Sequence, residues 1–301
     1  ACVFLPTFRR MTSRVTLVAV IGVVSTLVIV DRFDPPRANY DRFIDLELKG
    51  KYENVYTVIP WSPTQARTNF YVLPPGTIVD SEEPDAVNTS FGARTFVLGT
   101  DSVGQDVLSQ MMHACRLSIS IGLVSTGISV LIGIVIGSLM GYFGGWVDLV
   151  LSRVVEIFMA IPVLFLLIVA AAVLPRNTYM MMAIIGLVSW TLSARFIRAE
   201  FLKMRAQDFV QGARAAGLPL RSVLFRHMLP NGITPVLVQA SFAIAAAILA
   251  EATLSFLGLG PDGQASWGKL LASATGQTGT FNWWLAIFPG AAIFLTVLAY
   301  N

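Results

Sequence analysis

Two glycine-rich stretches near the C-terminal end match spacings that bind nucleotide phosphates. Gly258, Gly260 and Gly263 fit the dinucleotide-binding spacing G-x-G-x-x-G, and residues 263–269 fit G-x-x-x-x-G-K, the spacing of a phosphate-binding loop. The first spacing binds a pyrophosphate between a strand and a helix, whereas here it follows a long apolar run, so we interpret it as a turn at a helix exit. The second lacks the Ser or Thr that ligates Mg²⁺, because leucine follows its lysine. We therefore expect this chain not to hydrolyse ATP.

The other residues that could do chemistry are few and scattered. His113 and His227 are the only histidines, and no group of cysteines and histidines has metal-ligand spacing. No nucleophile lies beside a base in the way that covalent catalysis requires. The sequence therefore predicts no catalytic residue, no metal site and no bound cofactor, and it does not indicate an enzyme.

The composition indicates that the elements holding these residues lie in a membrane. Of the 301 residues, 55% are hydrophobic and only 13% are charged, and the mean hydropathy is +0.68. Soluble domains carry about 25% charged residues, so this chain has too few charges to cover a surface in water. The net charge of +3 by itself indicates no partner, and nothing suggests nucleic-acid binding.

Six apolar runs could each form a membrane-spanning helix, which needs about 20 mostly apolar residues. They cover Thr12–Val30, Leu117–Tyr142, Val147–Leu174, Tyr179–Ile197, Ile233–Leu257 and Trp283–Tyr300. No small-x-small cleavage site follows the first run, so we interpret it as an uncleaved anchor rather than a signal peptide. The sequence therefore predicts an all-α polytopic membrane protein with about six transmembrane helices.

Small residues and prolines inside these runs indicate how the helices pack. Gly133, Gly137 and Gly141 recur every four residues, a spacing that lets a second helix approach closely. Pro162 and Pro289 lie inside two other runs, which a helix bundle tolerates when its neighbours satisfy the freed carbonyls. We therefore expect a close helix contact along the glycines of the second run.

The charges predict which segments lie on each side of the membrane. Residues 195–227 carry seven Lys or Arg and two acids, whereas residues 31–110 carry twelve acids and seven bases. The positive-inside rule places the basic segment in the cytoplasm. We predict a cytoplasmic N-terminus and first transmembrane helix at 1–30, then a long extracytoplasmic segment. A core transmembrane domain follows at 111–301, with a cytoplasmic loop at about 199–230.

The cytoplasmic loop has the pattern of two short helices. We predict one helix over Ala206–Ala216 and a second over Leu220–Met228. Gly217 suits the left-handed C-cap of the first helix, and Pro219 suits the first turn of the second. Pro230 is expected to stop the second helix. Membrane helices on both sides of the loop exclude a DNA-binding helix-turn-helix.

This loop resembles the E-A-A signature of binding-protein-dependent ABC importer permeases, which reads E-A-A, three residues, G, nine residues, I, one residue, L-P. Those positions are occupied here by Gln211, Gly212, Ala213, Gly217, His227, Leu229 and Pro230. The spacing is intact, but Gln211 replaces Glu, Gly212 replaces Ala and His227 replaces Ile. Gln211 can still form hydrogen bonds, but it cannot form the ion pair that Glu would form.

A second stretch narrows the resemblance to peptide systems. Residues 98–110 look like the L-G-T-D-x-x-G-R-D-x-x-S-R signature of dipeptide, oligopeptide and nickel permeases, with Gln105 and Gln110 in place of two arginines. Further similar stretches are Gly141–Asp148, Leu254–Gly260 and Ser266–Gly268. The likeness runs from about Leu98 to Asn301 and is closest to the "C" type permease. Residues 31–97 match no pattern of the family, and we hypothesise that they help a binding protein to dock.

The resemblance implies the type I ABC importer permease fold and a non-catalytic subunit of an ATP-hydrolysing complex in the bacterial cytoplasmic (inner) membrane. The chain would form half of a translocation path for short peptides, and a second homologous permease subunit would form the other half. An extracytoplasmic solute-binding protein would deliver substrate. Two cytoplasmic ATPase subunits would bind ATP and dock on the 207–230 loop. The coupling residues implied are Gln211, Gly212, Ala213, Arg214, Gly217, Leu218, Pro219, Leu229 and Pro230.

Several alternatives stay open at this point. The substrate could be nickel or another small solute, although no His or Cys cluster indicates a metal path. A secondary transporter or channel would keep the topology without needing the basic loop, and such transporters often contain inverted repeats, which are not visible here. A membrane scaffold would bind partners without transporting a solute.

Two glutamates lie inside apolar runs and need an explanation. A carboxylate at mid-bilayer costs several kcal/mol, so such residues usually face a bundle interior or a cavity. Glu156 follows Arg153 closely near the cytoplasmic end of its run, which predicts an interfacial ion pair. Glu251 could line the translocation path together with Ser255, or it could form a structural hydrogen bond with a neighbouring helix.

Overall fold

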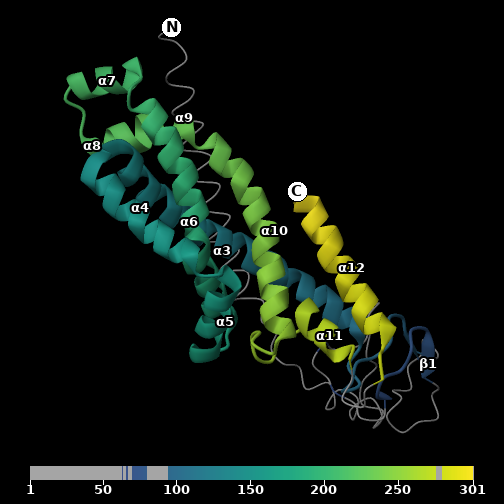
Figure 1. The fold of residues 1–301 in the computed structure, drawn as a ribbon. Coiled ribbons are helices and arrows are strands. Elements are labelled where there is room, and N and C mark those ends of the chain that lie inside the picture. The colour runs from purple at the N-terminus through teal and green to yellow at the C-terminus, as the bar shows by residue number, and fades with distance from the viewer. Residues whose placement is uncertain (1–62, 64–65, 67–69, 80–93, 276–279, 301) are drawn as a thin grey trace, which may run out of the picture. The chain divides into compact units, whose positions relative to one another are not determined.

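The computed structural model describes residues 63, 66, 70–79, 94–275 and 280–300 (Figure 1). The predicted first helix, Thr12–Val30, and most of segment 31–97 lie outside these residues. In chain order the elements are β1 (Thr77–Val79), β2 (Arg94–Phe96), α3 (Val107–Phe143), α4 (Gly145–Ala160), α5 (Val163–Val173), α6 (Thr178–Met204), α7 (Asp208–Ala215), α8 (Leu220–Ser222), the π-helix η2 (Val223–Met228), α9 (Leu229–Gly232), α10 (Thr234–Phe256), α11 (Trp267–Ser273) and α12 (Trp283–Tyr300).

The helices confirm the prediction of a polytopic membrane protein. Among the described residues, α3, α6, α10 and α12 are long and apolar enough to cross a membrane, and α4 with α5 adds a fifth crossing if this bent pair is one span. The predicted run Trp283–Tyr300 has the bounds of α12. Helix α6 begins one residue before the predicted Tyr179 but ends at Met204 rather than at the predicted Ile197. The hydrophobic pattern therefore located these helices well.

The predicted run Val147–Leu174 is wrong as a single helix. It is broken at Ile161 and Pro162, and the axes of α4 and α5 differ by 81°. Ile161 has an extended backbone, with φ −91° and ψ 127°, because the ring of a proline disfavours the helical region for the residue before it. Pro162 then forms the N-cap of α5. The apolar pattern continues through the break and therefore hides it.

Helix α3 begins earlier than the apolar run that predicted it. Its first residue is Val107 rather than Leu117, inside the segment predicted to be extracytoplasmic. Asp106 precedes the helix and accepts a hydrogen bond from the Ser109 amide at 2.7 Å, which satisfies one of the free donors of the first turn. The capping aspartate, rather than the start of the apolar run, therefore sets this end.

The described residues form two compact units. Unit 1 contains residues 120–251 and 296–300, and its contact between α3 and α6 confirms the predicted glycine packing. A Cβ at Gly133 would lie 2.9 Å from the Ala194 nitrogen, and one at Gly141 would lie 2.5 Å from the Phe201 Cβ. Gly137 faces Ala194 and Ile197 in the same way. The α3 glycines therefore let the two backbones come closer than any larger side chain would allow.

A buried apolar cluster in unit 1 joins α6 to the segment that follows it. Its members come from α3, α6, α7, η2 and α10, and they include Ile197, Phe201, Met204, Val210, Val223, Met228 and Val236. Helix α7 packs on η2, and α9 packs on α6. Figure 1 shows α7, α8 and α9 gathered beyond one end of α6. This packing fixes the basic loop to unit 1 as a folded element.

Unit 2 contains the described residues of 63–119 together with 252–275 and 280–295. Strands β1 and β2 pair antiparallel with Thr77 opposite Phe96. A buried cluster of Val107, Leu270, Ala274, Trp284 and Leu285 forms its core. Two indole N–H groups then bind backbone carbonyls: Trp267 donates to Met111, and Trp284 donates to Thr100, both at 3.1 Å. Residues distant in the sequence are thereby joined in one small core.

Candidate functional site

The predicted coupling segment folds as two helical pieces joined by a tight glycine turn. Helix α7 covers Asp208–Ala215, against the predicted Ala206–Ala216. The chain then turns at Gly217 as predicted, with a left-handed φ of +70°. The Gly217 amide donates to the Arg214 carbonyl at 3.0 Å, and the Leu218 amide donates to the Ala213 carbonyl at 3.2 Å. These two bonds make the double hydrogen-bonded end in which glycine is preferred. The turn therefore fixes the direction in which the chain leaves α7.

The second piece differs from the prediction of one helix over Leu220–Met228 that stops at Pro230. After the short α8, residues 223–228 form η2, and the helix continues through Pro230 to Gly232. Proline lacks an N–H and crowds the carbonyl four residues before it. The wider π-helix relieves this crowding, and the Leu229 amide bonds the Leu224 carbonyl, five residues back. Pro230 therefore widens the helix instead of ending it.

Most residues that the family signature singled out are exposed to solvent. Gln211, Gly212, Arg214, Gly217, Leu218 and Pro219 are exposed, Leu229 and Pro230 are half-buried, and Ala213 is buried. The Gln211 side-chain Nε2 donates to the Ala206 carbonyl at 3.1 Å. Apolar side chains accompany them on the same segment, since Phe209, Leu218 and Phe225 are 40%, 39% and 47% exposed. A surface with exposed leucine and phenylalanine among arginines is suited to binding another protein.

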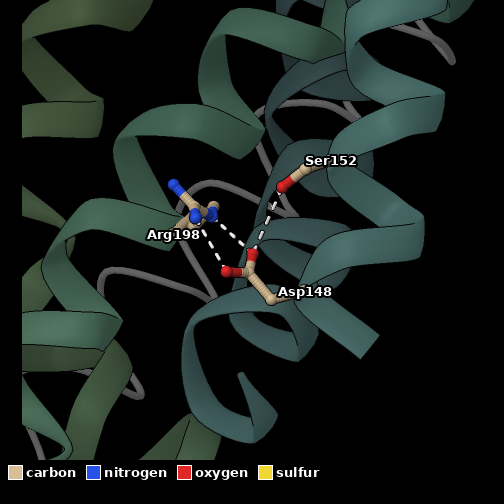
Figure 2. A network of polar contacts seen from close by, with 3 residues as sticks. All are labelled: Asp148, Ser152 and Arg198. Atoms are coloured by element: carbon tan, nitrogen blue, oxygen red, sulfur yellow. Dashed lines mark hydrogen bonds and ion pairs between the residues drawn. The ribbon is translucent and has the colours of Figure 1, made fainter. Parts of the chain in front are cut away.

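An ion pair that sequence reasoning missed joins α4 to α6. Arg198 binds both carboxylate oxygens of Asp148, with N–O distances of 2.5 and 2.7 Å, and the Ser152 hydroxyl donates to the same carboxylate at 3.3 Å (Figure 2). Bidentate pairing of this kind fixes geometry as well as charge. The two residues lie fifty positions apart in sequence, so no spacing rule reveals the pair. The sequence singled out Asp148 only as the end of the stretch Gly141–Asp148, and Arg198 only as a member of the basic segment.

The two glutamates of the apolar runs occupy different environments. Glu156 pairs with Arg153 at 2.5 Å, as predicted, and both side chains are largely exposed. Glu251 is fully buried in unit 1. Ser255 is buried in unit 2, where Gly260 and Gly268 lie directly against its side chain. Both side chains are buried here, and a role for them in lining the translocation path stays a prediction.

The 98–110 signature folds as a self-bonded turn that leads into α3. Asp101 accepts hydrogen bonds from the amides of Val103 and Gln105, both at 2.9 Å, and from the Gln110 side chain at 2.8 Å. The buried Thr100 hydroxyl donates to the Phe70 carbonyl at 2.6 Å. Burial raises the pKa of Asp106 to about 6, against the opposing effect of its amide hydrogen bonds. The signature is thus explained by packing and capping inside unit 2.

The first phosphate-binding spacing folds as a helix end, and the second folds as a loop that leads into α11, whose first residues are Trp267, Gly268 and Lys269. Gly258 has a left-handed φ of +76°, and the Leu259 amide donates to the Leu254 carbonyl at 2.8 Å, which ends α10 as predicted. The Lys269 ammonium donates to the carbonyls of Pro261 and Gln264. The lysine that a phosphate loop would use is therefore occupied by its own loop. In the part of the chain that the structure describes, no group of His, Cys, Asp and Glu could hold a metal ion.

Comparison with solved structures agrees with the fold. The chain is similar to an amino acid ABC transporter, with a TM-score of 0.50 and 17% identity over 64% of this chain and 90% of that chain. It is also similar to the MetNI methionine ABC transporter in inward-facing conformations, with a TM-score of 0.52 and 15% identity over 64% of this chain and 91% of that chain. At these identities the likeness concerns the fold, which is that of type I ABC importer permeases.

Comparison with curated sequences is more specific. A Brucella suis protein named as a peptide permease is 41% identical over 67% of this chain and 68% of its own length. The di/tripeptide permease DppC of Pseudomonas aeruginosa is 34% identical over 81% of this chain and 77% of its own length. The oligopeptide permease OppC of Haemophilus influenzae is 35% identical over 67% and 65%. Residues 133–301 match the family described as the binding-protein-dependent transport system inner membrane component. The chain belongs to that family of inner-membrane permease components of ABC transporters.

Proposed function

We propose that this chain is one permease subunit of an ATP-driven importer of short peptides, and that the 207–230 segment is where the ATPase subunits dock. One observation carries the proposal: a folded, exposed helix pair with apolar and basic residues is attached to a membrane-spanning bundle, at the position of the family's coupling signature. The relatives named for peptides favour a peptide as substrate.

In the proposed complex this chain supplies half of the path and performs no hydrolysis. A second permease supplies the other half, two ATPase subunits bind ATP, and an extracytoplasmic binding protein delivers the peptide. The N-terminus and the 207–230 segment lie in the cytoplasm, as the positive charge of that segment favours. Apolar contacts at Phe209, Leu218 and Phe225 give the docking its affinity, and the arginines around them orient the partner.

The docking proposal is tested by co-purification with the ATPase subunits. Gly217→Val places a branched side chain at a left-handed φ, which strains the turn after α7 even though the space around Gly217 is open. Gly212→Ala is the matched control, because it lies in α7 with no atom within 4 Å of an added Cβ. We expect ATPase recovery to fall with Gly217→Val alone. Equal recovery from both variants would contradict docking on this segment.

The substrate proposal is tested by uptake. Cells that express the complete transporter should accumulate a labelled dipeptide or tripeptide in an ATP-dependent manner, and excess unlabelled peptide should compete with it. Excess nickel should not compete. Uptake of nickel without uptake of peptide would instead establish the metal alternative. Peptide uptake that needs an ion gradient and no ATP would establish a secondary transporter.

A further inference from the structure

Helices α3 and α4 of unit 1 meet at a corner formed by residues 142–148. Gly144 and Gly145 both have left-handed backbones, with φ of +63° and +51°, so the chain turns between the two helices within two residues. Tyr142 lies just before the turn and is buried, and Asp148 lies in the first turn of α4. We call these residues the α3–α4 corner.

Three arginines from α6, α7 and the turn between them contact this corner. Arg198 of α6 holds Asp148 by both carboxylate oxygens. Arg205 follows α6, and its guanidinium occupies the space that a Cβ at Gly144 would take. Arg214 of α7 places its guanidinium carbon 4.9 Å from the centre of the Tyr142 ring, within the range of a cation–π contact. Each arginine therefore contacts a different part of the corner.

The three arginines lie on both sides of the turn that joins α6 to α7. Arg198 lies before that turn, Arg205 lies in it, and Arg214 lies after it. A shift of α7 relative to α6 must therefore either break the contact at Tyr142 or carry the corner along. Beyond the corner, α4 leads directly to the 81° bend before α5. The corner is thus one part of the membrane bundle that a displaced α7 would move, together with η2, on which α7 packs.

We infer that the α3–α4 corner transmits movement of α7 into α4. Its positioning residues are Tyr142, which contacts Arg214, Gly144, which contacts Arg205, and Asp148, which pairs with Arg198. This inference rests on the proposed docking of ATPase subunits at the 207–230 segment. It adds the route by which a force at α7 reaches the membrane-spanning helices.

The contact at Tyr142 gives the sharpest test, because a matched control exists. Tyr142→Leu removes the aromatic face that Arg214 covers, whereas Tyr142→Phe keeps it. The complete complex, reconstituted in proteoliposomes with its binding protein, is assayed for peptide transported per ATP hydrolysed. We expect this ratio to fall about two- to fivefold with Tyr142→Leu, the range that a cation–π contact with a solvent-exposed guanidinium such as that of Arg214 supports, and to stay unchanged with Tyr142→Phe.

A double-mutant cycle distinguishes loss of the Arg214–Tyr142 contact from a general disturbance of the fold by Tyr142→Leu. Arg214→Gln should lower the ratio as much as Tyr142→Leu does, and the two changes together should lower it no further. Additive losses, or an unchanged ratio in both single variants, would overturn the inference while the proposed function stands. A parent complex that hydrolyses ATP without transporting peptide would overturn the proposed function, and the inference with it.

Discussion

Replacing Gly133 by alanine tests the helix contact on which unit 1 is built. A Cβ at this position would lie 2.9 Å from the Ala194 nitrogen and 3.0 Å from the Ser193 carbonyl carbon, and it would also overlap the Ser193 side chain. Backbone atoms cannot rotate away, so α3 and α6 must separate. Ser193 also donates a buried hydrogen bond to Gln239 of α10 at 2.9 Å, and the displacement would strain that bond too.

The expected change in the free energy of unfolding follows from two opposing effects. Overpacking of a filled interior costs about 1–3 kcal/mol, whereas glycine to alanine inside a helix returns about 0.5–1 kcal/mol. Gly127→Ala isolates the second effect, because Gly127 lies in the same helix with no atom within 4 Å of an added Cβ. The free energies of unfolding of the two variants should therefore differ by about 1–3 kcal/mol, with Gly133→Ala the less stable.

The assay is the unfolding of the purified chain in detergent, followed by circular dichroism as denaturant is added. Both variants are compared with the parent under one set of conditions, so the detergent affects them equally. Equal stability of Gly133→Ala and Gly127→Ala would refute the argument, because it would mean that the α3–α6 contact has room for a methyl group.

Three further predictions concern particular side chains. The pKa of Asp106 is raised to about 6 in the folded protein, above its usual 3.8, so the folded state binds a proton at this carboxyl more tightly than the unfolded state does. The free energy of unfolding of the parent should therefore fall as pH rises from about 4 to 6. Asp106→Asn keeps the helix cap, and its thermal midpoint should lack that part of the pH dependence. Gln110→Leu removes a donor from the buried Asp101 carboxylate, so the free energy of unfolding should fall by about 1–3 kcal/mol, and an unchanged value would mean that water replaces the amide. Glu251 is fully buried, so Glu251→Gln should keep both assembly and peptide uptake, whereas loss of uptake from an assembled complex would assign the carboxylate to the path.

The sequence predicted those elements that depend on local pattern. Apolar periodicity located both ends of α10 and α12 and the start of α6 to within one residue, but α6 runs on to Met204, seven residues past the predicted Ile197. The glycine spacing in α3 predicted a close helix contact, and the structure identifies α6 as the partner. Gly217 was identified from conformational preference alone, because few other residues adopt its left-handed backbone at low cost.

The features that the sequence did not predict depend on backbone effects of proline inside an apolar run, or on contacts between distant helices. The run is apolar on both sides of Ile161, so hydrophobicity could not show the bend, although Pro162 was a local signal. Pro230 was expected to end a helix, but the π-helix η2, which packs on α7, lets the helix continue through it. The pairing of Asp148 with Arg198 exists only once α4 lies beside α6.

The most direct test of the account is to isolate this chain from its native membrane in mild detergent and identify by mass spectrometry the proteins that remain bound. The account predicts a second permease of the same family and ATPase subunits in stoichiometric amounts, with the ATPase subunits depleted from the Gly217→Val variant. Recovery of the chain alone, or only with copies of itself, would contradict it.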